Sequence, residues 1–216
     1  GNMVTVEFDS AIAKNEVGYI QVGDERLKGE VIRIKGNEAA LQVFEMTSGV
    51  AVGDSVEFTS EMLSVELGPG LLQQIYDGLQ NPLPQLAEQC GFFLQRGVYL
   101  KPIADNEWEF TQVAKKGDQL AAGDTFGTVV EGLFTHQIMV PFDMVDGPWT
   151  VTAIKGNGTY HARDTICSVE NAKGVKRDLS MIFTWPVKKA IKLYEERLRP
   201  TETLVTKIRT IDTFLP

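Results

Sequence analysis

The run from Leu63 to Leu83 joins two kinds of sequence pattern and fixes where this chain changes structure. A strand pattern ends at Gly68-Pro69-Gly70, because glycine adopts backbone angles closed to other residues and proline cannot donate to a strand ladder. Beyond this turn, apolar residues recur at helical spacing until Asn81-Pro82 breaks the pattern. They are Leu72, Ile75, Tyr76 and Leu79. The run therefore predicts a strand, a tight turn and a helix.

A second helical pattern follows directly, so Leu71 to Gly91 is the only stretch for which helix is expected. Its apolar face would carry Leu83, Leu86, Ala87 and Cys90, and Gly91 stands where a C-terminal cap belongs. Such a stripe of leucine, isoleucine and tyrosine indicates core packing, and it contains no cofactor-binding motif.

The first 60 residues instead show short strands and tight turns. Val31–Lys35 alternates apolar and basic residues, Gly36-Asn37 is a hairpin signal, and Ala40–Glu45 would be the returning strand. Several short strands separated by frequent turns are typical of a small closed barrel, in which closure removes exposed strand edges.

The pattern becomes β-like again from Val113. Two Gly-Asp turns, Gly117-Asp118 and Gly123-Asp124, flank short apolar strands, and Trp149–Ile154 continues the series. A last strand pair is expected to end near Met181. This is a second, separate β module.

Composition excludes some functions. The chain has 216 residues, a net charge of −8 and a pI near 4.9, which argue against nucleic-acid binding because phosphate contacts need clustered lysine and arginine. The one basic cluster, Lys188–Lys192, is short and is expected to be a solvated linker. No apolar run approaches the ~18 residues of a membrane helix.

The cysteine and histidine residues do not form the patterns typical of disulfide, redox or metal sites. Cys90 and Cys167 stand outside any CxxC motif, so a reduced, cytoplasmic chain is expected. His136 and His161 lack companions at metal-ligand spacing, and each is expected to be an ordinary surface or core histidine.

Five segments resemble, in order, the catalytic A subunit of V-type rotary ATPases. Besides the run from Leu63 to Leu83, they are Gly29–Ile34 with Gln42–Gly49, Thr184–Lys188, and Arg209–Pro216. The last one is similar to the Arg-x-Ile-Asp-Thr-Phe-Phe-Pro sequence that leads towards the phosphate-binding loop in that family. Just before this segment, Lys207 and Thr203 depart from the family, which usually has glycine and proline at these two positions. These departures put the local turn geometry in doubt.

The resemblance implies a division of the chain. Between Leu83 and Trp185 lies a long insertion, the bulge or non-homologous domain, which the noncatalytic B subunit and the F-type catalytic subunit lack. A mainly β fold follows: an N-terminal closed barrel at residues 3–68, a short helical linking segment at 69–112, a bulge at 113–183 resembling a biotinyl/lipoyl-like barrel-sandwich hybrid, and the start of a nucleotide-binding domain at 184–216.

The same resemblance implies an ion-translocating ATPase in which these residues are not catalytic. No G-x-x-x-x-G-K-[ST] sequence occurs, and Gly68-Pro69-Gly70 has no lysine or hydroxyl residue after it. The family's general-base glutamate and arginine finger also lie outside. We therefore predict no catalytic, cofactor-binding or metal-binding residue here and no ATPase activity; ATP and Mg²⁺ would belong to the parent subunit.

Partners and location follow from the resemblance as well. B subunits and peripheral-stalk subunits are the expected partners, with membrane contact only through the complex and with the chain monomeric when alone. It would lie in the cytoplasmic ATPase head, peripheral to the membrane. Whether the enzyme moves protons or sodium, and in which direction it runs, is left open.

Two alternatives stay open at this stage. Val113 to Val151 also suggests a biotinyl or lipoyl carrier, which needs a modifiable lysine at a hairpin tip; Ile138-Met139-Val140 offers none, and Lys115 and Lys116 precede the turn. The other alternative is a free-standing β-domain adaptor.

Overall fold

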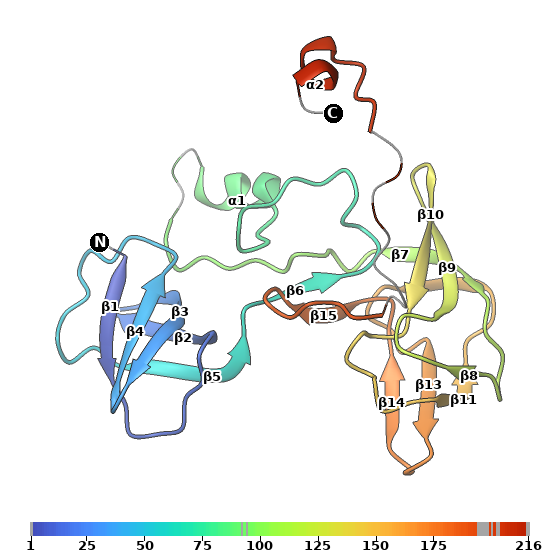
Figure 1. The fold of residues 1–216 in the computed structure, drawn as a ribbon, viewed down its shortest axis with the longest axis horizontal. Helices are drawn as coiled ribbons and strands as arrows, with labels where there is room; N and C mark the ends of the chain where they lie inside the picture. The colour runs from blue at the N-terminus through green and yellow to red at the C-terminus, as the bar shows by residue number, and fades with distance from the viewer. Residues whose placement is uncertain are drawn as a thin grey trace.

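The computed structural model describes residues 2–91, 93, 95–193, 199, 201 and 204–214. Two β modules lie on either side of a short central ladder, and the C-terminal tail extends away from both (Figure 1).

The N-terminal module is a five-stranded antiparallel sheet with strand order β1-β4-β3-β2-β5. Its strands are β1 (Met3–Glu7), β2 (Glu16–Val22), β3 (Glu25–Lys35), β4 (Glu38–Val43) and β5 (Val56–Met62). The predicted hairpin at Gly36-Asn37 is confirmed, because β3 and β4 pair across it with Lys35 opposite Glu38. Gly36 has a φ of +62°, a conformation that glycine adopts at little cost.

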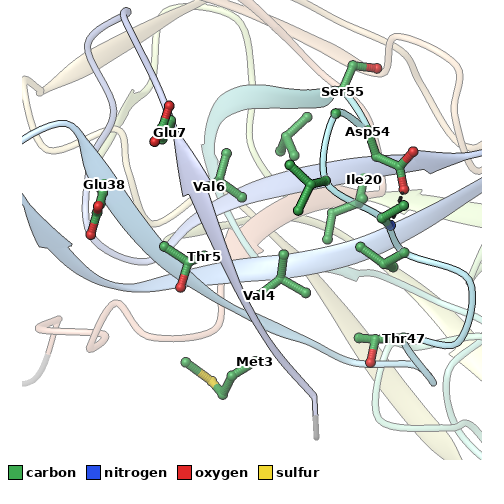
Figure 2. Close-up of a pocket in the computed structure, with 15 residues that line it drawn as sticks. Met3, Val4, Thr5, Val6, Glu7, Ile20, Glu38, Thr47, Asp54 and Ser55 are labelled. Carbon is green, nitrogen blue, oxygen red and sulfur yellow. Dashed lines mark hydrogen bonds between the residues drawn. The ribbon is translucent and has the colours of Figure 1, made fainter.

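The module is barrel-like because its two edge strands pack on the same interior. Val6 of β1 and Phe58 of β5 both contact the buried cluster of Val31, Ala39 and Leu41. No ladder joins β1 to β5 among the described residues, and an open groove of about 800 Å³ lies between β1 and residues 47–56 (Figure 2). Side-chain packing therefore completes this barrel.

A two-stranded antiparallel ladder joins the two modules. β6 (Ser64–Leu67) pairs with β15 (Phe183–Pro186), so that Leu67 faces Phe183 and Ser64 faces Pro186. After Leu67 the chain passes through residues 68–106 and then enters the second module, from which it returns to the ladder at Phe183. The second module is thus an insertion, as the sequence indicated.

The prediction of a helix around Leu72–Leu79 is wrong. Residues 71–82 form successive turns, with Gln73 and Gln80 at φ values of +63° and +64° that a right-handed helix cannot contain. The Asp77 carboxylate accepts hydrogen bonds from the backbone amides of Leu79 and Asn81 and so stabilises a turn instead. Local side-chain hydrogen bonds decided the conformation against apolar spacing.

The second predicted helix is confirmed as α1 (Leu83–Cys90). Pro84 lies in its first turn, where its missing N–H costs nothing. Gly91 ends the helix at φ +71° and donates its N–H to the Ala87 carbonyl. Of the expected apolar face, only Leu86 is buried within the helix.

The insertion (residues 107–182) consists of two four-stranded antiparallel sheets. One has the order β10-β9-β7-β12 and the other β14-β13-β11-β8. The strands are β7 (Glu107–Gln112), β8 (Gln119–Leu120), β9 (Thr125–Glu131), β10 (Phe134–Met139), β11 (Trp149–Ile154), β12 (Gly158–His161), β13 (Cys167–Asn171) and β14 (Lys176–Leu179). One core cluster contains residues from both sheets, including Phe110, Phe126, Trp149 and Val169.

The tail ends in α2 (Arg209–Phe214), which has no buried residue. Lys207 precedes it at φ +65°, in the left-handed region that favours glycine, which explains why the resembling family has glycine there. The Asp212 carboxylate accepts hydrogen bonds from Thr206 and the Lys207 amide, and these contacts lower the pKa of Asp212. The other departure, Thr203, lies outside the described residues.

Candidate functional site

The turn that follows β6 binds a carboxylate of the insertion. In this junction loop (residues 68–72), the amides of Gly70 and Leu72 both donate to Oε1 of Glu131, at 2.7 and 3.0 Å. Gly70 has a φ of +103°, which glycine tolerates and which lets both N–H groups converge. Such converging amides form an anion-binding nest. The anion here is supplied by the last residue of β9.

The second oxygen of Glu131 is also satisfied. His136, on β10, places Nδ1 2.7 Å from Glu131 Oε2. The Glu131 side chain is only 7% exposed and that of His136 is 23% exposed. A buried carboxylate is tolerated when both oxygens have hydrogen-bond donors. His136 is therefore a partner of Glu131, and its role is to hold that carboxylate.

A salt bridge fastens the other end of the junction loop. Both terminal nitrogens of Arg163 bond the two carboxylate oxygens of Glu66, at 3.0 and 2.8 Å, and Nη2 also donates to the Ile103 carbonyl. The hydrogen bonds to Glu66 raise the pKa of Arg163 further above its usual range. A planar, bidentate pair fixes direction as well as distance. Arg163 belongs to the insertion, and Glu66 belongs to β6.

Between these two contacts, the backbones touch. A Cβ placed on Gly68 would lie 2.8 Å from the Met181 carbonyl oxygen and 2.8 Å from Ile182 Cγ1. Glycine at this position therefore allows the junction loop to lie directly against the strand that returns from the insertion.

The linking segment is fastened to the barrel by a separate set of contacts. The Tyr99 hydroxyl lies 2.8 Å from Glu45 Oε2 and accepts a hydrogen bond from the Lys28 amide. Burial and the bond to Glu45 raise the pKa of Tyr99 well above its usual range. The amide of Gly97 donates to the other oxygen of Glu45 at 2.6 Å.

The basic cluster is not simply a solvated linker, and that prediction is corrected for one residue. Lys188 Nζ lies 2.8 Å from Oε2 of Glu30, whose side chain is 6% exposed. A buried carboxylate requires a partner, and the first lysine of the cluster provides it. Lys189 lies over the Trp185 ring, 5.1 Å from its centroid.

The remaining candidate residues have ordinary surroundings. His161 is half exposed beside Asp105 and Glu107. Cys90 and Cys167 are free thiols; Cys167 is buried, which raises its pKa to about 11. In the described part of the chain, no group of three or more His, Cys, Asp and Glu side chains is placed to hold a metal ion. No helix among these residues is long and apolar enough to cross a membrane.

The sequence patterns did not indicate Glu131, Glu66 or Arg163, and His136 was expected to be an ordinary surface or core histidine. These residues share no motif: Glu131 is 61 positions from Gly70, and Arg163 is 97 positions from Glu66. The one sequence signal was the Gly68-Pro69-Gly70 turn, which identified the place but not its partners. The arrangement performs no evident reaction; it joins an insertion to the backbone from which it departs.

Two protein-family models match the two β modules of this chain, one each. Residues 1–60 match the family model described as the ATP synthase alpha/beta family, beta-barrel domain. Residues 102–188 match the ATP synthase alpha/beta subunit barrel-sandwich domain.

Three relatives that align with the whole chain are V-type ATP synthase alpha chains. The V-type ATP synthase alpha chain of Treponema denticola is 58% identical, that of Treponema pallidum (alpha chain 1) 56% and that of Borreliella burgdorferi 51%. Each alignment covers 100% of this chain and 37–38% of the relative, so the chain spans well under half of their length. The similarity runs in order through the barrel, the junction and the inserted barrel-sandwich module. The chain therefore belongs to the V-type ATP synthase alpha chain family and corresponds to the N-terminal part of its members.

Proposed function

We propose that this chain is the assembly part of the catalytic A subunit of a V-type rotary ATPase. The whole subunit would couple ATP hydrolysis or synthesis to proton or sodium transport. The observation that carries this proposal is the insertion itself, a barrel-sandwich module that lies between β6 and β15 in the chain and is fastened beside their ladder by Glu131 and Arg163. A module held this firmly can transmit force, which a stalk-docking element must do.

Each of the four predicted parts of the chain would have its own role. The barrel (residues 3–68) would join neighbouring B subunits in a ring. The predicted bulge (113–183), which is the part of the insertion after β7 together with Phe183, would dock on peripheral-stalk subunits. The linking segment (69–112), which includes β7, and residues 184–216 would lead into the nucleotide-binding domain. The chain would then lie in the ATPase head, in contact with the membrane only through the complex.

ATP and Mg²⁺ would be bound elsewhere in the subunit. A phosphate-binding loop needs free backbone amides, a lysine and a hydroxyl group. The amides of Gly70 and Leu72, which form the converging pair in the junction loop, are already bonded to Glu131. Their occupation by an internal carboxylate supports a structural role for this loop.

Binding to stalk subunits tests the proposal. The purified chain should be monomeric in light scattering and should bind the peripheral-stalk subunits of its own complex in a titration. A control deletes residues 107–182 and joins Asn106 to Phe183 by a short flexible linker; it should lose stalk binding while the N-terminal barrel stays folded. Equal stalk binding with and without the insertion would contradict the docking role, and a stable hexamer of the chain alone would contradict the monomer.

A further inference from the structure

We propose that Glu131 is a positioning residue that locks the insertion to the junction loop, so that the two open and move as one body. The transmission of movement from a docked stalk rests on the proposed function, but the lock itself rests only on contacts within this chain.

The tip of the hairpin that carries Glu131 has little apolar burial. Val130 is 68% exposed, and Leu133, at the turn between β9 and β10, is 95% exposed. Hydrophobic burial therefore contributes little at the tip, although Val129 and Ile138 anchor the rest of the hairpin in the core. Glu131 is the exception at the tip, since it is buried among apolar neighbours that face solvent. Its hydrogen bonds are therefore the polar contacts that join this tip to the junction loop.

The strength of this contact comes from the charge of Glu131 and from the hydrogen-bond partners of both its carboxylate oxygens. A hydrogen bond to an ionised group is roughly twice as strong as a bond between neutral groups. Glu131 receives two such bonds from separate amides of the junction loop and a third interaction from His136. Breaking the contact would expose two amides and leave a carboxylate with one partner.

The lock works because the loop is held at both ends. Glu66, before the junction loop, is bound by Arg163 between β12 and β13, whereas Gly70 and Leu72 are bound from the β9–β10 hairpin. Between them, Gly68 lies against Met181 and Ile182. A displacement of the insertion must therefore carry residues 66–72 with it. If the insertion docks on a stalk, its displacement reaches the backbone that leads to α1.

Native-state hydrogen exchange of the 216-residue chain tests the lock. In the unsubstituted protein, the amides of Gly70 and Leu72 should exchange with the same opening free energy as the β9–β10 ladder amides, since one cooperative unit opens together. Glu131→Gln removes the charge but keeps an acceptor. It should accelerate exchange at Gly70 and Leu72 by about tenfold relative to the hairpin, consistent with the loss of one charge-assisted contribution.

The matched control is Glu109→Gln, the same chemical change at an exposed position of β7 in the same sheet; it should leave the Gly70 and Leu72 rates within about twofold. If Glu131→Gln fails to fold, His136→Ala provides the test, because it keeps the carboxylate and removes only its imidazole partner. It should accelerate the same two amides by about threefold. The proposal is overturned if the substituted chain that folds leaves the Gly70 and Leu72 rates unchanged relative to the hairpin. It is also overturned if Glu109→Gln changes them equally. The measurement uses neither nucleotide nor partner, so a failure of the lock is distinguishable from a failure of stalk binding.

Discussion

Replacement of Phe110 by alanine is expected to lower the free energy of unfolding of the insertion by about 3–5 kcal/mol. The Phe110 side chain is completely buried between the two sheets, with its ring centroid 6.3 Å from that of Tyr160 and 6.5 Å from that of Phe126. A Cβ on Gly127 would lie 2.0 Å from Phe110 Cε2, so the ring packs directly on that backbone. Alanine would leave a cavity that these rigid neighbours cannot fill.

Urea denaturation followed by tryptophan fluorescence measures this effect, because Trp108 and Trp149 both lie in the insertion. The matched control is Phe134→Ala, which removes the same ring from a position that is 59% exposed and should change stability by less than about 1 kcal/mol. Equal destabilisation by the two substitutions would show that Phe110 is not at the centre of the core.

Substitution of Gly68 by alanine is expected to destabilise the junction by about 1–3 kcal/mol, the usual cost of overpacking. The added methyl group would meet the Met181 carbonyl and Ile182 at 2.8 Å, and backbone atoms cannot rotate away as a flexible side chain can. We expect the β6–β15 ladder to separate locally, which hydrogen exchange at Leu67 and Phe183 would detect as faster exchange.

Gly78→Ala is the control for this experiment. A Cβ on Gly78 has open space, with nothing within 4 Å, and the residue does not have a positive φ. Alanine there should be neutral or stabilise the chain by up to about 1 kcal/mol, because it reduces the conformational freedom of the unfolded state. A Gly68→Ala chain as stable as the Gly78→Ala chain would contradict the close approach at the junction.

Much of the fold could be predicted because local patterns agree with it. Gly36-Asn37 specifies a tight hairpin wherever it occurs between strands, and the Gly-Asp turns of the insertion act in the same way, with the Asp118 and Asp124 carboxylates bonding the amides of Lys115 and Ala121. Alternation of apolar residues placed the strands, and the structure confirms two β modules separated by a linking segment.

The error at residues 71–82 has a physical reason. Leu72, Ile75, Tyr76 and Leu79 have helical spacing, but spacing reports only which side chains share a face. The backbone followed Asp77 and the junction-loop amides instead, because Glu131 binds Gly70 and Leu72 from outside the segment. A tertiary partner that is 61 positions away cannot be found by reading a local pattern.

Distant tertiary contacts also explain why the residues that fasten the junction loop could not be predicted. Glu66, Glu131 and Arg163 are charged residues of ordinary types in sequence positions without a motif, and exposed salt bridges generally matter little. Only the fold shows that Glu131 is buried and that Arg163 grips Glu66 with both terminal nitrogens. The sequence could nevertheless indicate the junction, because Gly68-Pro69-Gly70 required an unusual backbone there.

A calorimetric titration of the 216-residue chain with magnesium and ATP tests whether these residues serve assembly alone. The junction-loop amides are bonded to Glu131, and we therefore expect no binding heat from micromolar to millimolar nucleotide. Binding of ATP with a dissociation constant in the micromolar range would instead show a nucleotide site in this part of the subunit.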